Sequence, residues 1–309
     1  MKDIDAIDRL LLGSENAPPQ PVLALGGYRD AADQGSSVAA LRLSMMAAQG
    51  VGRMPDWHEA LDWLAKAAVI GSDLARGQLA ALSGRSDVAS EDDIRYARAA
   101  IDPKVLLTPP KVHGLSEAPR IGVIKGLAAP AWCDWIIKSA GPFLEPSLVY
   151  DGATGDLQRS SARTAMAADF GFLRRDLVMA AVQERLARIT GLRVPFHEVP
   201  NVLSYEGGQE FRTHFDFLDP VREAAEIEAV GQRVITCLTY LNDAYEGGET
   251  RFPLIGIQYR GRPGDCLLFF NVTPENQPDR RTAHAGLPPA SGRKWLLSQM
   301  LRNRMQPLV

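Results

Sequence analysis

The triplet His214-Phe215-Asp216, together with the distant His284, constrains the fold of this chain more than any other feature. Residues i and i+2 of a β-strand point to the same face, so His214 and Asp216 can bind one metal ion while Phe215 points away. His284 would supply a third ligand from a distant strand. Two imidazoles and one carboxylate leave coordination positions open, and this set suits non-haem Fe(II) that must also bind a cosubstrate and O₂. The pattern predicts a β-rich domain with an oxygenase-type metal site.

A lysine lies ten residues after His284, immediately before the apolar run WLLSQML. Strand alternation would place Lys294, Leu296, Ser298 and Met300 on one face. A lysine that faces the interior of a barrel is costly unless an anion pairs with it. We therefore expect Lys294 to bind a carboxylate of the cosubstrate.

The pattern of apolar residues changes at about residue 120. The runs IGVIKGL, VITCLTYL and DCLLFFNV are short, rich in β-branched or aromatic residues, and bounded by Gly, Pro, Asn and Asp, which is typical of strands. Two segments, PAWCDWIIKSAG and RRDLVMAAVQERLARITG, have helical spacing instead. The order predicts an α+β domain, an antiparallel double-sheet barrel with helices braced on one sheet.

Small residues recur at an offset of 36 residues near the N-terminus. Such spacing is typical of packed helical hairpins, whose close crossings leave little room for large side chains. The matching pairs are Gly35/Gly71, Ala32/Ala68, Ala39/Ala75 and Leu43/Leu79. The segment resembles the tetratricopeptide-like repeats of the Sel1-like class, with one full repeat and part of another. A plain helical subdomain with no binding role is the alternative.

These patterns divide the chain into four segments. Residues 1–25 are expected to form an N-terminal helix and linker, and residues 26–100 a small all-α helical-repeat region. Residues 101–119, which contain several prolines, are expected to form a linker. Residues 120–309 would form the metal-binding domain.

Composition disfavours several classes of function. The 34 basic and 37 acidic residues leave a formal net charge of −3, which provides no electrostatic footprint for nucleic acid or an anionic membrane. No apolar stretch approaches a membrane span, and the acidic N-terminus is unlike a signal peptide. Three widely spaced cysteines, Cys133, Cys237 and Cys266, are expected to be reduced thiols of a cytoplasmic protein. The oligomeric state is left open.

Five segments in the second half of the chain resemble, in order, the catalytic domain of prolyl 4-hydroxylase-type Fe(II)/2-oxoglutarate dioxygenases. They are QRSSARTAM, NVLSYEGGQEFRTHFDF, RVITCLTYLNDAYEGGETRFP, RPGDCLLFFN and TAHAGLPPASGRKWLLSQML. With LAAPAWCDWII upstream, the resemblance covers about residues 120 to 305. It implies a double-stranded β-helix, which is a jelly-roll core.

The resemblance also implies roles for individual residues. His214, Asp216 and His284 would bind Fe(II), and Lys294 would bind the distal carboxylate of 2-oxoglutarate. The other residues expected to line the cosubstrate pocket are Tyr205, Tyr240, Thr250 and Ser298. Arg233 would face a peptide substrate, and the loop of residues 151–169 would fold over it. O₂ would be the second cosubstrate, and ascorbate would keep the iron reduced.

The resemblance implies hydroxylation of a prolyl or other residue in a protein or peptide, with release of succinate and CO₂. Two departures bear on the substrate: Phe211 replaces a tyrosine found in many relatives, and Met300 replaces a tryptophan. Both remove a polar group while keeping apolar bulk. A free amino acid or small metabolite is therefore an alternative substrate. A second alternative is a binding module in which the helical region does the work and the barrel is catalytically weak.

Overall fold

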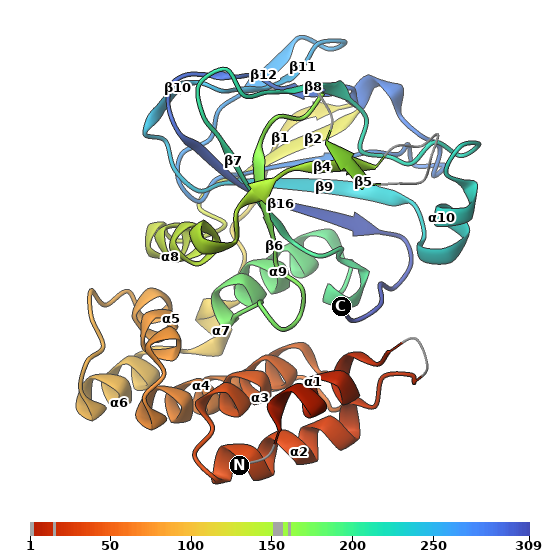
Figure 1. Ribbon diagram of the computed structural model, residues 1–309. Helices are drawn as coiled ribbons and strands as arrows, with labels where there is room; N and C mark the ends of the chain where they lie inside the picture. The colour runs from red at the N-terminus through yellow and green to blue at the C-terminus, as the bar shows by residue number, and fades with distance from the viewer. Residues whose placement is uncertain (1–2, 15–16, 151–156, 160–161) are drawn as a thin grey trace. The chain divides into compact units, whose positions relative to one another are not determined.

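The computed structural model describes residues 3–14, 17–150, 157–159 and 162–309 (Figure 1). The chain forms two compact units. Unit 1 comprises Met1–Thr108, Gly171–Arg185 and Leu308–Val309, and unit 2 comprises Pro109–Phe170 and Leu186–Pro307.

Unit 1 is helical over the residues that the structure describes. Its helices are α1 (Ile4–Leu12), α2 (Pro21–Asp33), α3 (Ser37–Gln49), α4 (Trp57–Ile70), α5 (Asp73–Ser83), α6 (Glu91–Ala100) and the short α7 (Pro103–Leu106). Buried alanines such as Ala39, Ala67 and Ala75 let these helices approach closely. The predicted all-α region is present.

Two helical hairpins of unit 1 repeat the same local structure. The helices α2 and α4 each end before a glycine with positive φ, Gly35 at 90° and Gly71 at 113°. A serine then caps the next helix: Ser36 accepts from the Ala39 N–H of α3, and Ser72 from the Ala75 N–H of α5. The 36-residue offset in the sequence is therefore a repeat of helix, glycine turn and serine cap.

Unit 1 also contains the first part of α9 (Leu177–Thr190), a helix that continues into unit 2 at Leu186. The Leu177 N–H donates to the Gln78 side chain of α5 at 3.0 Å, and the Arg42 guanidinium of α3 donates to the Leu173 carbonyl at 2.5 Å. The first bond satisfies a buried backbone N–H at the start of α9, and the second binds the segment that precedes this helix. The helix predicted at RRDLVMAAVQERLARITG is confirmed.

Unit 2 contains the helices α8 (Pro130–Ala140) and α10 (Ala224–Val230), and a set of strands. The strands of the first part are β1 (Val112–Glu117), β2 (Arg120–Ile124), β3 (Glu145–Pro146), β4 (Leu148–Tyr150), β5 (Leu157–Arg159), β6 (Met166–Asp169), β7 (Asn201–Tyr205) and β8 (Phe211–His214). The others are β9 (Arg233–Tyr240), β10 (Tyr245–Gly247), β11 (Thr250–Phe252), β12 (Ile257–Tyr259), β13 (Cys266–Phe270), β14 (His284–Gly286), β15 (Pro289–Gly292) and β16 (Lys294–Arg302).

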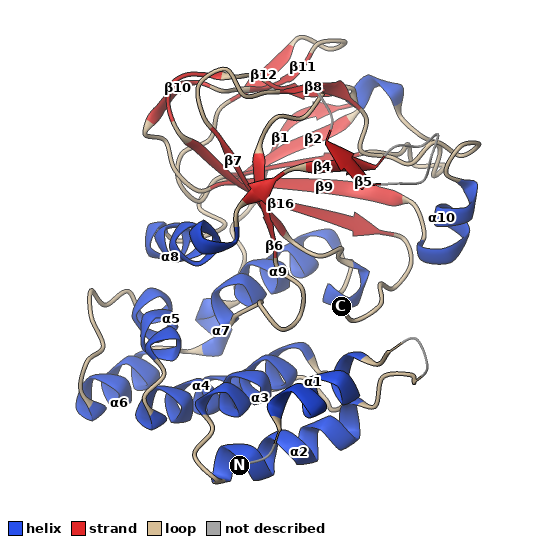
Figure 2. Ribbon diagram, viewed as in Figure 1, coloured by secondary structure: helices blue, strands red, loops and turns tan. Residues whose placement is uncertain are grey.

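Two antiparallel sheets of unit 2 face each other, as Figure 2 shows. The eight-stranded sheet has the order β1-β2-β13-β9-β16-β7-β6-β3, and the four-stranded sheet has the order β12-β11-β14-β8. Inward-facing residues of both sheets form one apolar core, which includes Leu203, Leu238, Phe252, Phe269 and Leu296. This is the double-stranded β-helix expected for the domain, and the predicted α+β class is confirmed.

Two segments contain more regular structure than the sequence indicates. The expected linker, residues 101–119, contains α7 and β1. Pro103 is compatible with α7 because it occupies the first turn of the helix, where its missing N–H is not needed. The expected loop, residues 151–169, contains β5 and β6, while its residues 151–156 and 160–161 lie outside the described residues.

The cysteines Cys133, Cys237 and Cys266 are free thiols and buried, as expected. Among the described residues, none of the helices combines the length and the apolar character needed to cross a membrane. The predicted cytoplasmic location stays a prediction.

Candidate active site

The three predicted metal ligands lie together in unit 2. His214 ends β8, His284 begins β14, and the two are partners in the antiparallel register. Asp216 lies in the bend just beyond β8. Its Oδ1 is 3.4 Å from His214 Nε2, and its Oδ2 is 3.5 Å from His284 Nε2. One ligand atom from each of the three residues lies within 4.8 Å of the others, so a single ion can contact all three.

Backbone carbonyls orient both imidazole rings. His214 Nδ1 contacts the Arg212 carbonyl at 2.8 Å, and His284 Nδ1 contacts the Thr282 carbonyl at 3.1 Å. A carbonyl only accepts, so Nδ1 carries a hydrogen, and in the neutral form of each ring the lone pair of Nε2 then faces Asp216. The Phe211 ring stacks on His214 with centroids 3.5 Å apart, which further restricts this ring.

The protonation states also suit a metal site. Burial lowers the pKa of His284 to about 4, although the neighbouring Asp216 acts in the opposite direction. Burial alone would raise the pKa of Asp216, but His284, His214 and the Thr236 hydroxyl together hold it well below its ordinary value. At neutral pH a neutral imidazole therefore faces an ionised carboxylate. This donor set, on one face with open positions opposite, fits Fe(II).

Lys294, the first residue of β16, lies in the same pocket as the metal ligands. Its side chain is 1% exposed, and its Nζ lies 5.4 Å from the centre of the Tyr205 ring and 5.6 Å from that of Tyr240. Within the described part of the chain, no carboxylate forms an ion pair with it. A buried ammonium without an anion is costly, which is the arrangement expected of a site for a carboxylate ligand.

The pocket is apolar apart from a few polar groups, and its space is about 460 Å³ including the open mouth. Besides the metal ligands and Lys294, its lining consists of Arg163, Leu203, Tyr205, Phe211, Leu238, Thr250, Gly286, Leu296, Ser298 and Met300. Tyr205, Thr250 and Ser298 thus lie where they were expected. Tyr240 lies behind Thr250, and its hydroxyl lies 2.8 Å from the Thr250 hydroxyl. The roles predicted for these four residues stay predictions.

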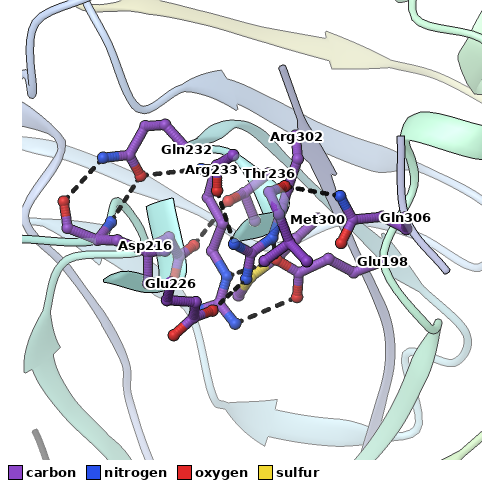
Figure 3. A network of polar contacts seen from close by, with 12 residues as sticks. Glu198, Asp216, Glu226, Gln232, Arg233, Thr236, Met300, Arg302 and Gln306 are labelled. Carbon is purple, nitrogen blue, oxygen red and sulfur yellow. Dashed lines mark hydrogen bonds and ion pairs between the residues drawn. The ribbon is translucent and has the colours of Figure 1, made fainter. Parts of the chain in front are cut away.

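Arg233 lies outside the pocket lining, in a cluster of charged residues shown in Figure 3. Its Nε and Nη2 donate to the two carboxylate oxygens of Glu198 at 2.7 and 3.1 Å. Arg302 binds the same Glu198 and also Glu226 of α10. The Arg233 side chain is 28% exposed and forms an ion pair with Glu198. A substrate that contacted Arg233 would therefore meet a guanidinium whose charge is already paired. The predicted contact of Arg233 with a peptide stays a prediction.

Arg163 is a pocket residue that the sequence did not single out. Its guanidinium carbon lies 5.2 Å from the centre of the Phe211 ring, and its charge and hydrogen bond act on the buried Tyr205 hydroxyl. Its Nε is buried and has no hydrogen-bond partner among the described residues. Its signal in the sequence is a basic residue inside QRSSARTAM, one of the segments that resemble the family.

Comparison with known proteins agrees with this geometry. A family model described as the 2OG-Fe(II) oxygenase superfamily matches residues 200–302. "Probable prolyl 4-hydroxylase 7" of Arabidopsis thaliana is 33% identical over 205 residues, which cover 60% of this chain and 64% of that protein. "Prolyl 4-hydroxylase 2" of the same plant is 31% identical over 214 residues, which cover 62% of this chain and 70% of that protein. The chain belongs to the prolyl 4-hydroxylase family.

Membership of this family makes the chain a 2-oxoglutarate-dependent Fe(II) dioxygenase, and His214, Asp216 and His284 form its iron site. The chain spans about two thirds of the length of these plant relatives. Among solved structures, the 2-oxoglutarate complex of the viral collagen prolyl hydroxylase from Paramecium Bursaria Chlorella virus-1 is similar. It is 24% identical, with a TM-score of 0.47, over 59% of this chain and 95% of that one.

Binding of 2-oxoglutarate is expected to weaken as the pH rises above 7. Burial lowers the pKa of Lys294 to about 7, so in the protein without 2-oxoglutarate this side chain is increasingly neutral above this pH. A carboxylate bound beside it favours the ammonium form, so binding then takes up a proton. Titration of Lys294 should raise the dissociation constant of 2-oxoglutarate by up to about tenfold per pH unit above 7 and leave it constant below 7.

Calorimetry of 2-oxoglutarate binding to the Mn(II)-loaded protein, in buffers of different ionisation enthalpy, measures both the affinity and the proton uptake. Lys294→Arg is the control, because a guanidinium stays charged throughout this range. A wild-type affinity that is constant between pH 7 and 9 would contradict the prediction.

Proposed function

We propose that this chain hydroxylates a prolyl residue of a protein or peptide. In this reaction 2-oxoglutarate and O₂ are consumed, succinate and CO₂ are released, and one oxygen atom enters the substrate. The observation that carries the proposal is one pocket that joins an open iron-binding face to the buried Lys294. The names of the plant relatives supply the substrate class.

The residues of the chain bind and orient the reactants. When bound, the iron supplies the activation of O₂. The ammonium of Lys294 holds the distal carboxylate of 2-oxoglutarate, and Ser298 offers a further hydroxyl donor in the lining of the same pocket. The apolar Leu203, Leu238 and Leu296 exclude water from the cosubstrate. His214, Asp216 and His284 would hold the iron near the other end of the cosubstrate, so the chain would orient 2-oxoglutarate from both ends.

Arg163 supports an extended peptide as the substrate. Its guanidinium lines the pocket together with His214 and retains an unpaired Nε–H donor among the described residues. A peptide has a carbonyl on either side of the proline, and either one could accept from this donor. Phe215, 39% exposed and stacked on Phe217 with centroids 4.7 Å apart, offers an apolar surface for the neighbouring side chains.

For the helical region, we propose a Sel1-like repeat that helps to recruit a macromolecular substrate. The supporting observation is the repeated hairpin, in which α2–α3 and α4–α5 share the glycine turn and the serine cap. Repeats of this kind commonly present extended binding surfaces. Recruitment predicts a lower KM for a folded protein substrate than for a short peptide of the same local sequence.

Succinate formation in the presence of Fe(II), 2-oxoglutarate, O₂ and ascorbate tests the substrate class. We expect proline-containing peptides to stimulate succinate formation, and mass spectrometry to locate one added oxygen atom on proline. A peptide in which alanine replaces that proline should not stimulate turnover. Capture of partners by the His284→Ala variant would then supply candidate protein substrates, whose KM values are compared with those of the peptides.

His214→Ala is the control for catalysis by the iron site. The peptide proposal is wrong if free proline or another small metabolite gains oxygen while peptides do not. If the wild-type chain and His214→Ala are equally inactive with peptides, amino acids and 2-oxoglutarate alone, the assignment as a hydroxylase fails.

A further inference from the structure

The metal ligand Asp216 is held by a buried threonine of β9. The Thr236 hydroxyl donates to Asp216 Oδ2 at 2.7 Å, as Figure 3 shows. Thr236 is 0% exposed and Asp216 is 5% exposed, so water does not compete for this bond. Strand alternation places Thr236 on the same face of β9 as the core residues Leu238 and Tyr240. A valine would fill this position equally well by shape, so packing does not require the hydroxyl.

A second buried side chain fixes the direction of this hydrogen bond. Asn271, which directly follows β13, donates from Nδ2 to the Thr236 hydroxyl oxygen at 2.9 Å. An ionised carboxylate only accepts, so the single proton of the threonine must point to Asp216. The threonine oxygen is then left as an acceptor, and the asparagine amide supplies the donor that it requires. In this relay of two hydrogen bonds, Asn271 donates to Thr236 and Thr236 donates to Asp216.

The backbone of Asn271 continues the hydrogen-bond chain to a second ligand. Its carbonyl accepts from the Asp279 N–H at 2.9 Å. The Asp279 carbonyl accepts from both the N–H and the hydroxyl of Thr282, at 3.0 and 2.7 Å. The Thr282 carbonyl in turn accepts from His284 Nδ1 at 3.1 Å. Asn271 is therefore connected by hydrogen bonds to two of the three metal ligands.

We propose that Thr236 and Asn271 are positioning residues that hold Asp216 in its metal-binding orientation before the metal arrives. Because Thr236 occupies Oδ2, the other oxygen of Asp216 is left to face the ion. The carboxylate cannot turn without leaving the buried Thr236 hydroxyl and the Asn271 amide unpaired. Outer-shell hydrogen bonds of this kind commonly set metal affinity. The inference concerns the iron site alone, so it does not depend on the identity of the substrate.

The affinity for Mn(II), measured from the electron paramagnetic resonance of the free ion, tests this role without any turnover. Thr236→Val keeps the shape and removes the hydroxyl, and it should raise the Mn(II) dissociation constant by about 10- to 100-fold. Thr236→Ser restores the hydroxyl and should bind Mn(II) nearly as tightly as the wild type. A role in packing alone would give the opposite order, because serine leaves a gap and valine does not.

Asn271→Ala provides a second, independent arm, because it removes the amide but keeps the backbone carbonyl. It should weaken Mn(II) binding in the wild-type chain and have little further effect in the Thr236→Val chain, since Asn271 acts on Asp216 through the threonine. If one variant failed to fold, as judged by its melting temperature, the other would still test the relay. Wild-type Mn(II) affinity in a folded Thr236→Val or Asn271→Ala protein would overturn the proposal.

Discussion

Replacement of Asp216 by alanine is expected to abolish coupled and uncoupled consumption of 2-oxoglutarate, with a loss of about 1,000-fold or more. Asp216 is the only carboxylate of the described metal cluster, and its two oxygens lie 3.4 and 3.5 Å from the imidazoles of His214 and His284. Without it, two imidazoles remain to hold a hard divalent cation. Succinate formation with and without substrate measures the loss.

The matched control for this variant is Asp243→Ala, which removes an exposed carboxylate of unit 2. It should retain wild-type turnover and Mn(II) affinity. The metal-free Asp216→Ala protein should still unfold cooperatively, but at a lower melting temperature than the wild type, because the buried Thr236 hydroxyl loses its acceptor. Asp243→Ala should match the wild type, and a cooperative transition in both variants would separate loss of the metal from loss of the fold. An Asp216→Ala protein that still produced succinate at a tenth of the wild-type rate would exclude this residue as an essential ligand.

Replacement of Lys294 by methionine is expected to raise the KM for 2-oxoglutarate by about 100-fold, with a smaller effect on kcat. Removal of one member of a buried ion pair costs about 3 kcal/mol, because the other charge is left unpaired, and this corresponds to about two orders of magnitude in affinity. Methionine fills a similar volume but carries no charge. Steady-state kinetics at saturating substrate and varied 2-oxoglutarate measure the change.

The same variant should make the metal-free protein more stable. Burial lowers the pKa of Lys294 to about 7, whereas in the unfolded chain the amine has its ordinary pKa and binds a proton more tightly. At and below neutral pH the lysine therefore opposes folding, and the opposition is relieved as the pH rises from 7 towards the ordinary value of 10.5. Lys294→Met should raise the melting temperature at pH 7, while the control Lys138→Met, at an exposed position of α8, should not.

If Lys294→Met raised the KM for 2-oxoglutarate without raising the melting temperature, charges at longer range would be offsetting the cost of burying the Lys294 ammonium. A gain in stability without an increase in KM would exclude it as the carboxylate anchor. Together, the two measurements distinguish a functional buried charge from a structural one.

The iron-binding face could be predicted because its chemistry is local. His214 and Asp216 are two residues apart, and strand geometry alone aligns such residues on one face. His284 and Lys294 belong to one contiguous segment, and the predicted strands at VITCLTYL, DCLLFFNV and WLLSQML are β9, β13 and β16. In each case the pattern extends over fewer than about ten residues, so one sequence was sufficient.

Residues whose role depends on a partner far along the chain could not be predicted in this way. The ion pair of Arg233 with Glu198 could not be predicted, because no sequence pattern links the two segments, while the contact of Arg233 with a substrate stays a prediction. The position of Arg163 in the pocket depends on a bridge to Phe211. Strand alternation can mark Thr236 as an inward-facing polar residue, but it cannot show what the hydroxyl contacts.

The sequence by itself determined the ligand types, the α+β class and the helical repeat spacing, and it predicted a positive charge to bind the cosubstrate, because these follow from residue chemistry and short-range periodicity. Only the tertiary structure decided which polar groups meet. It brought Asn271 to Thr236 and Thr236 to Asp216, paired Arg233 with Glu198, and left Lys294 without a carboxylate among the described residues. The physical reason is that pairing between distant strands depends on sheet register, which arises from packing of the whole core and not from any one segment.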